Sequence, residues 1–294
     1  MTGPVVVGLD GSPASVTAAW WAAREAVDRG LPLLLLHSWT TQPLNVPVPQ
    51  EALSKQRYGG QVLQRTEAEL LHRHSGLSVT SELVSDPAAQ ALLAAGETAS
   101  LLVLGSRGHG SVASFLLGSI SLHVLGLAHC PTVVVRAGDP AVPEGWRPTA
   151  DDRGEIVVGV QHNGPTIAPL LEFALTTAQL HHTRVLAVRA LPLSSLMTHP
   201  QALTEPGDEA WQAVEHGRLA AELAPWREKF PDVELEQRID RGAPAQVLLA
   251  ASAHSRLTVV GRRRHPSRVT WKLGPVAHAA LHHMPCPVAV VPHD

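Results

Sequence analysis

The strongest constraint on the fold is an internal repeat that runs through nearly the whole chain. Gly8 in "VVVGLD" corresponds to Gly159 in "IVVGVQ", 151 residues further on. Later landmarks keep a constant spacing of 156 residues: Gly105 with Gly261, Gly118 with Gly274, and Cys130 with Cys286. A repeat of this length predicts two domains built on one plan.

The domain limits follow from the segment that separates the two copies of the repeat. We expect domain 1 over residues 1–137, a linker over 138–153 and domain 2 over 154–294. The linker is rich in proline, glycine and charged residues and shows no hydrophobic periodicity, which is typical of linkers. The chain of 294 residues is about twice the usual length of one domain, so each half can bury its own core.

Each copy alternates short apolar runs with helical patterns, which predicts an α/β fold: a doubly wound, five-stranded parallel sheet in each of two tandem domains. Near-continuous hydrophobicity in most of these runs indicates strands covered on both faces. In the first copy the expected strands are 5–9, 31–38, 77–84, 100–105 and 131–136, and in the second 155–160, 184–191, 233–239, 256–261 and 287–292.

Helix ends in the first copy are marked by capping residues. Ser12-Pro13 and Asp86-Pro87 each predict a capping side chain ahead of a proline in the first helical turn. Gly30 is placed as the glycine that ends the first helix.

Doubly wound sheets bind ligands at the carboxyl ends of their strands, where the strand order reverses. We expect that crevice between the ends of strands 1 and 4, after "VVVGLDGS" and at Gly105.

A glycine-rich loop follows strand 4, with glycines at 105, 108, 110 and 118. Such a loop and the helix start after it can hold an anion with backbone N–H groups, to which Ser119 and Ser121 add hydroxyls. Arg107 and His109 can offset negative charge. The alternative is that these glycines only turn the chain, and neither of the better-known phosphate-binding patterns is present.

These residues carry a resemblance to a known family. Gly105-x-x-Gly108, nine residues and then Gly118-Ser119 is similar to the G-2x-G-9x-G-[ST] loop of the universal stress protein family, and "VVVGLDGSPAS" resembles its first strand and turn. The resemblance covers nearly the whole chain as two tandem domains. It implies an adenine nucleotide alpha hydrolase-like, Rossmann-like fold with strand order 3-2-1-4-5. Such a protein binds ATP, with or without Mg²⁺, and is linked to stress survival.

The resemblance also implies the site. Gly8 and Asp10 would border the adenosine, and the backbone near Ser38 would lie near the adenine. The phosphates would be wrapped by Gly105, Arg107, Gly108, His109 and Gly110, and the helix start would close the site with Gly118, Ser119, Ile120 and Ser121. From its charge alone, Asp10 suits a ribose hydroxyl or a bound cation better than a bare phosphate.

The second copy departs from this pattern. Gln161 stands in place of Asp10, Arg264 in place of Gly108 and Pro275 in place of Ser119. Proline removes an N–H and a hydroxyl from the helix start. The second copy gains positive charge from Arg262, Arg263 and Arg264. An altered anion-binding site therefore remains an alternative, but a purely structural role for the second domain is favoured.

Composition excludes several other classes. A formal charge of −3 and 4% aromatic residues argue against nucleic acid as a partner. No apolar run reaches the length of a membrane span and no signal peptide is visible, so we expect a cytoplasmic protein without a membrane partner. Two cysteines and the scattered histidine pairs predict neither a disulfide framework nor a metal site.

Two further segments bear on partners. The fifth strand of each domain predicts a sheet edge, and the edges can pair as an intramolecular pseudo-dimer or between chains as a homodimer. Residues 40–60, rich in proline at their start, are expected to form a long connection. It is either a lid or partner surface, or a disordered connection without specific function.

Two functions fit these features. The first is a stress-response regulatory protein that binds ATP or a related adenine nucleotide in domain 1 and changes conformation or association. The alternative is a slow ATP hydrolase or nucleotide-dependent transferase. Asp10, Arg107 and His109 are few candidates for catalysis, and none is evidently placed to act as a base on an attacking group. We therefore predict no catalytic residues and at most weak ATPase activity. A scaffold that has lost nucleotide binding fits domain 2 better than domain 1.

Overall fold

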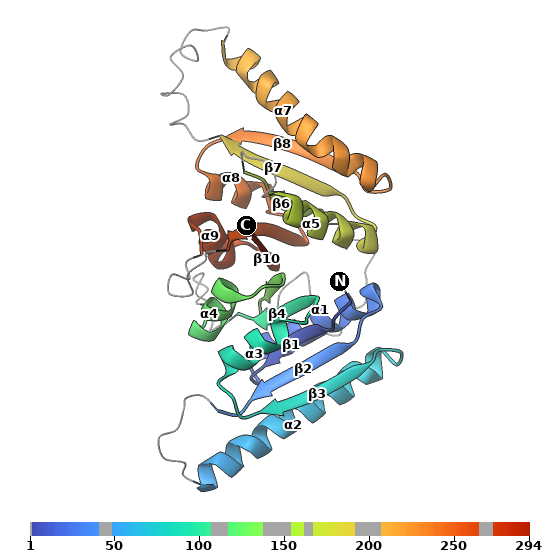
Figure 1. Ribbon diagram of the computed structural model, residues 1–294, viewed down its shortest axis with the longest axis vertical. Helices are drawn as coiled ribbons and strands as arrows, with labels where there is room; N and C mark the ends of the chain where they lie inside the picture. The colour runs from blue at the N-terminus through green and yellow to red at the C-terminus, as the bar shows by residue number, and fades with distance from the viewer. Residues whose placement is uncertain are drawn as a thin grey trace. The chain divides into compact units, whose positions relative to one another are not determined.

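A computed structural model describes residues 2–40, 49–106, 117–137, 154–161, 167–191, 207–264 and 273–294. The chain divides into two compact units, one holding β1 to β5 and the other β6 to β10 (Figure 1). The expected linker, 138–153, lies outside the described residues, so the residue limits of the domains stay a prediction.

The first unit is a parallel sheet of five strands in the order β3-β2-β1-β4-β5. This confirms the expected fold class and strand order. Its elements are β1 Val5–Leu9, α1 Pro13–Arg29, β2 Leu33–Ser38, α2 Pro49–Arg73, β3 Val79–Val84, α3 Ala88–Gly96, β4 Leu101–Gly105, α4 Ser119–Leu127 and β5 Thr132–Val135.

The second unit repeats the plan in the order β8-β7-β6-β9-β10, again parallel throughout. Its elements are β6 Ile156–Gly159, α5 Ala168–His181, β7 Val185–Leu191, α7 Gly207–Lys229, β8 Leu235–Arg241, α8 Pro244–Ala251, β9 Leu257–Arg263, α9 Pro275–His283 and β10 Val288–His293. Cys130 and Cys286 are both buried.

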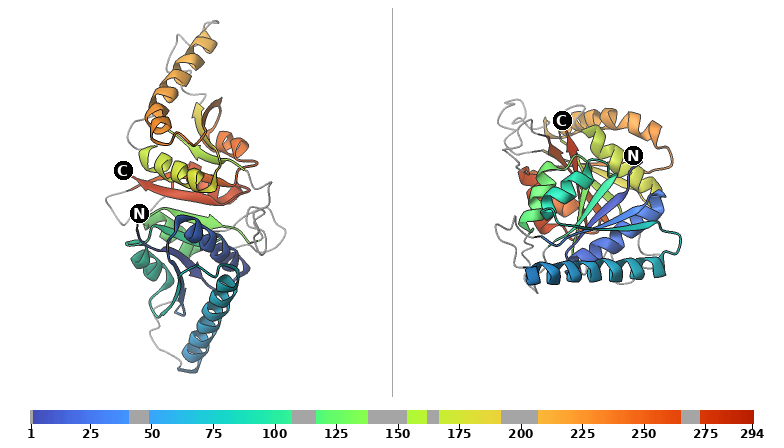
Figure 2. Two further views of the ribbon diagram at one scale, coloured as in Figure 1. Left: turned by 90° about the vertical axis from the view of Figure 1, so that its right-hand side faces the viewer. Right: turned by 60° about the horizontal axis from the view of Figure 1, so that its bottom comes forward.

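Helices cover both faces of the first sheet (Figure 2). On one face α3 and α4 bury a cluster that includes Val6, Leu92, Leu102 and Val124. On the other face α1 packs on β1 and β4, and α2 packs on β2 and β3. The continuous apolar strands are therefore explained by burial from two sides.

The start of α1 is fixed by its cap. The Ser12 hydroxyl accepts a hydrogen bond from the Ser15 backbone N–H (3.2 Å), and Gly30 ends the helix in the left-handed region (φ 63°). Both predictions for this helix are confirmed. The predicted cap at Asp86 is wrong: Pro87 is the N-cap of α3, and it makes no side-chain capping hydrogen bond. Pro87 itself is extended (φ −53°, ψ 132°), so the helix begins at Ala88, one residue later than predicted.

A second expectation fails at residues 40–60. Residues 49–60 belong to α2, which begins at Pro49. Proline fits the first helical turn, where its missing N–H is not needed, and the helix then runs through Gly59-Gly60 because its packing on β2 and β3 outweighs their weak helix propensity. Residues 49–60 are therefore helical and not part of a long loop, and 41–48 lies outside the described residues.

Gly105, the last residue of β4, is contacted directly by the backbone of α1. A Cβ at this position would lie 2.6 Å from the Ala14 carbonyl carbon and 2.7 Å from the Ser15 nitrogen. Neither backbone atom can yield without moving the helix. The glycine therefore sets how closely the first turn of α1 approaches the end of β4.

Gly105→Ala is expected to lower the free energy of unfolding by about 1–3 kcal/mol, because the added methyl group displaces the first turn of α1. Gly60→Ala is the matched control: it lies in α2, nothing lies within 4 Å of the added Cβ, and alanine should stabilise by about 0.5–1 kcal/mol. Urea unfolding followed by circular dichroism measures both. Equal effects would show that the close approach at Gly105 has no energetic weight.

Candidate functional site

The site is built where β1 and β4 lie side by side at the centre of the first sheet. The strands pair in parallel, Val5 with Leu101 and Val7 with Val103, so their carboxyl ends meet at one edge. To one side the chain winds through β2 and β3, and to the other through β5. This is the reversal of strand order at which such sheets bind ligands.

The turn after β1 holds Asp10 in a defined position. Gly11 adopts a positive φ of 82°, which lets the chain bend into α1. The Ser12 backbone N–H donates to Asp10 Oδ1 (2.9 Å), and the Asp10 N–H donates to the Ser15 hydroxyl (3.3 Å). The carboxylate is thus fixed at the strand end while its side chain stays exposed.

Asp10 is ionised over a wide pH range. Partial desolvation raises its pKa, but the hydrogen bonds from Ser12 and Ser15 together outweigh that effect, and the pKa lies below its ordinary value of 3.8. A carboxylate that stays charged at neutral pH can accept ribose hydroxyls or coordinate a cation, and it repels a bare phosphate.

Two of the expected site glycines have a packing reason to be glycine. A Cβ on Gly8 would lie 3.1 Å from Leu92 and 3.3 Å from Leu104, so this position makes room for α3. Gly105 makes room for α1, as described above. Both residues border the strand ends, but their missing side chains are explained without a ligand.

Ser38 ends β2, and its hydroxyl is used within the protein. It donates to the Asp86 carbonyl (2.6 Å) and lies 3.0 Å from the Thr40 carbonyl. These hydrogen bonds tie the end of β2 to the segment after β3. A ligand at this strand end would therefore meet the backbone, as the family resemblance implies.

The start of α4 presents backbone groups without a side-chain cap. Gly118 is the buried, extended N-cap residue and supplies no capping side chain. Ser119 and Ile120 are exposed, while Ser121 is buried. The first N–H groups of a helix have no partner within the helix and carry its positive dipole end, which favours an anion.

The rest of the expected phosphate loop is not described by the structure. Arg107, Gly108, His109 and Gly110 lie outside the described residues, so their roles stay a prediction. The structure brings Gly8, Asp10 and Gly105 to the paired ends of β1 and β4, and Ser38 to the end of the neighbouring β2. It places Gly118 to Ser121 at the start of α4.

Sequence reasoning missed His37 and Tyr58. His37 precedes Ser38 on β2, is 5% exposed, and its ring packs against Gly59 and edge-on to Tyr58, with ring centroids 6.3 Å apart. Burial lowers the His37 pKa, and a hydrogen bond with the Leu9 backbone and the charge of Asp10 oppose this only partly. Gly59 inside a helix was the signal that another group comes close there.

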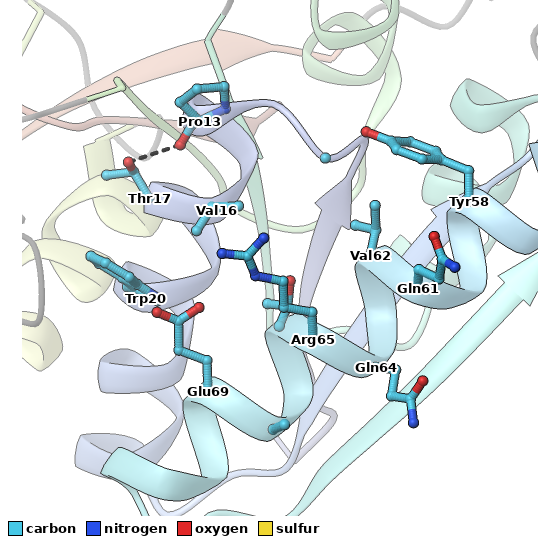
Figure 3. A pocket seen from close by; sticks show the side chains of 13 residues that line it. Pro13, Val16, Thr17, Trp20, Tyr58, Gln61, Val62, Gln64, Arg65 and Glu69 are labelled. Carbon is cyan, nitrogen blue, oxygen red and sulfur yellow. Dashed lines mark hydrogen bonds between the residues drawn. The ribbon is translucent and has the colours of Figure 1, made fainter.

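Tyr58 reaches the β1–α1 turn from α2. A Cβ on Gly11 would lie 2.3 Å from the Tyr58 hydroxyl oxygen, so the glycine also makes room for this side chain. Beside it runs an open groove of about 870 Å³ between α1 and α2, lined by Trp20, Arg65 and Glu69 among others (Figure 3). The groove is lined by α1 and α2 and, in the turn after β1, by Gly11.

In the second unit the corresponding strand ends carry different chemistry. Gln161 follows β6, Arg262 and Arg263 end β9, and Pro275 begins α9 after the N-cap Gly274. The structure thus confirms that a proline occupies the helix start where the first unit has Ser119.

Within the described ranges no group of three or more His, Cys, Asp or Glu side chains is placed to hold a metal ion. None of the helices that the structure describes combines the length and the apolar character needed to cross a membrane.

Comparison with known proteins gives one consistent family. The model of the Universal stress protein family matches residues 1–136 and 153–292. A universal stress protein of Mycolicibacterium smegmatis is 30% identical over 302 residues, covering 98% of this chain and 96% of the relative. Universal stress protein Rv2005c of Mycobacterium tuberculosis is 31% identical over 297 residues, covering 97% and 96%. The crystal structure of a universal stress protein from Archaeoglobus fulgidus has the same fold, with a TM-score of 0.72 at 16% identity over 99% of this chain and 98% of that one.

Ser12→Ala is expected to raise the Asp10 pKa toward 3.8, because it removes a hydroxyl hydrogen bond that favours the carboxylate. It should also cost about 1 kcal/mol of stability through the lost cap. Carboxyl ¹³C NMR titration measures the pKa. Thr17→Ala, one turn further along α1, should leave it unchanged.

The sign of the pH effect follows from the direction of that shift. Because the Asp10 pKa is depressed on folding, its contribution to stability is present above the pKa of the unfolded chain and is lost as the pH falls through the folded value. The effect is small because the side chain is exposed. A folded Asp10 pKa above 3.8 would contradict the hydrogen-bond account.

Proposed function

Because the chain belongs to the universal stress protein family, we propose that its first domain binds an adenine nucleotide and acts as a nucleotide-dependent regulator in the stress response. The observation that carries this proposal is the position of one motif. Gly105 ends β4 at the reversal of strand order, and Gly118-Ser119 begins α4 at the spacing that the family's nucleotide loop uses. A loop anchored in this way presents backbone N–H groups to phosphates.

The charges at the strand ends narrow the choice of ligand. An ionised Asp10 at the end of β1 suits the ribose hydroxyls or a divalent cation. The uncapped start of α4 suits phosphate oxygens. We therefore propose ATP, with Mg²⁺ as the cation that Asp10 would help to hold, and we place the protein in the cytoplasm.

A binding role is favoured over catalysis. In the described part of the crevice Asp10 is the ionised group, and its hydrogen bonds with Ser12 and Ser15 hold it in the turn after β1. Its low pKa makes it a weak general base. Nucleotide binding would then act through conformation or association, and the fifth strand of each domain stays the proposed edge for pairing within one chain or between two.

Release of the ligand by denaturing the purified protein, followed by mass spectrometry, should reveal an adenine nucleotide. Calorimetric titration with ATP and Mg²⁺ measures affinity if the protein is purified empty. No released nucleotide together with no heat at millimolar ATP would contradict the binding proposal. Single-turnover release of ADP well above the uncatalysed rate, lost in Asp10→Ala, would establish the hydrolase instead.

The double variant Gly108→Arg, Ser119→Pro converts the first loop toward the second. It should leave domain 1 folded and weaken ATP binding at least tenfold, or about 1.4 kcal/mol, because it removes a hydroxyl and an N–H donor. The reverse change in the second unit, Arg264→Gly with Pro275→Ser, is the matched control and should leave the affinity of domain 1 unchanged. Unaltered affinity in the first variant would mean that these glycines only turn the chain.

A further inference from the structure

The groove between α1 and α2 has the make-up of a small-molecule site. Its volume is about 870 Å³, within the range of roughly 300–1,000 Å³ that is usual for ligand pockets. Apolar side chains line it from both helices: Pro13, Val16 and Trp20 on α1, and Val62 on α2. Ligand pockets combine such walls with a few polar groups that orient the ligand.

One arginine supplies a positive charge inside this groove. Arg65 lines the groove and reaches from α2 toward α1, on the side of Val16 (Figure 3). Its guanidinium has no hydrogen-bond or ion-pair partner among the described residues. The side chain is exposed, so a solute reaches it without any movement of the chain. A guanidinium is permanently charged, and its planar fork of donors matches a carboxylate.

The nearest acidic side chain in the groove has another partner. Glu69 follows Arg65 by one turn of α2, and its Oε1 lies 4.0 Å from Arg73 Nη2. Arg73 also lies over the Trp20 ring, 5.1 Å from the ring centroid. The Trp20 end of the groove therefore holds a negative group of its own, which repels an anion and directs it toward the opposite end.

That opposite end is apolar. Val16 and Val62 line it together with the ring of Tyr58, which is 52% exposed. Both valines are branched at Cβ and have restricted rotamers, so they form a stiff wall. A ligand that covers these three side chains removes apolar surface from water, which favours binding.

From this arrangement we infer that the groove binds a small organic acid with an apolar body. Arg65 donates two parallel hydrogen bonds to the carboxylate, and the body lies among Val16, Val62 and Tyr58. The inference does not rest on the proposed nucleotide site. Of the described residues assigned to the nucleotide, none lines this groove.

Tyr58 reports binding directly, because it is the one tyrosine of the chain. Protein grown with ¹³C-labelled tyrosine gives a single set of ring signals in NMR, which needs no assignment. Titration with sodium 2-naphthoate and, separately, sodium octanoate should shift these signals to saturation with at least one of them. The acid that binds more tightly assigns the body as aromatic or aliphatic. No saturable shift with either acid overturns the proposal.

Two further probes test the two halves of the ligand at constant ionic strength. The neutral amide of the tighter acid keeps the body and lacks the charge, whereas sodium acetate keeps the charge and lacks the body. Each should bind at least tenfold more weakly than the acid. Equal affinity for the amide would contradict the role of Arg65, and equal affinity for acetate would contradict the role of the apolar wall.

Variants of two arginines on α2 locate the charge. Arg65→Gln should weaken binding of the acid at least tenfold and change the affinity for its amide less than twofold. Arg57→Gln is the matched control, because Arg57 is exposed on the same helix two turns earlier and does not line the groove. It should change the affinity for the acid less than twofold. Equal losses in the two variants would indicate general attraction by surface charge and would contradict the site.

A last pair of measurements separates this site from the nucleotide site. Arg65→Gln should leave the affinity for ATP within twofold, and Gly108→Arg, Ser119→Pro should leave the affinity for the acid unchanged. If Arg65→Gln weakened ATP binding as much as binding of the acid, the groove would belong to the nucleotide site and the inference would fail. If the protein bound no ATP, the proposed function alone would fail, and the Tyr58 titration would still decide whether the groove binds an acid.

Discussion

The close contact between the end of β4 and the first turn of α1 determines how the first unit presents its strand ends. Gly105 has no side chain, so the backbone at Ala14 and Ser15 comes within reach of the sheet. Ser15 is also the residue whose hydroxyl accepts the Asp10 N–H. The packing of one helix on one strand therefore holds the turn after the neighbouring strand, and the carboxylate at Asp10 is positioned by backbone contacts rather than by a flexible loop.

Comparison of the two units separates the positions that packing of the sheet requires from those that can change. Gly261 takes the place of Gly105, yet a Cβ there would meet the side chains of His293 and Leu170 instead of helix backbone. Gly8 and Gly159 both make room for a leucine, Leu92 in one unit and Leu248 in the other. Packing positions are thus retained, while Asp10, His37 and Ser119 become Gln161, Arg189 and Pro275. The sheet can be kept while the chemistry at its carboxyl ends changes.

Much of the fold could be predicted because it depends on local signals and a simple period. Apolar strands buried on both faces, the Ser12 cap and the Gly30 helix end can be recognised from a few adjacent residues. One failure has a long-range cause: the helical segment 49–60 is held by packing of α2 on β2 and β3. Packing also explains the missing side chains of Gly8 and Gly105, whose place in the ligand site stays a prediction.

By itself, the sequence determined the repeat, the α/β class, the parallel sheet and the family, because each follows from spacing, periodicity or a motif within one short stretch. Only the tertiary structure decided which side chains meet at the strand ends. Pairing with β1 and β6 places His37 and Arg189 at corresponding strand ends. There His37 Nδ1 and Arg189 Nε and Nη1 are buried without a hydrogen-bond partner among the described residues. Burial and hydrogen-bond satisfaction depend on residues far apart in the chain, so no local pattern reports them.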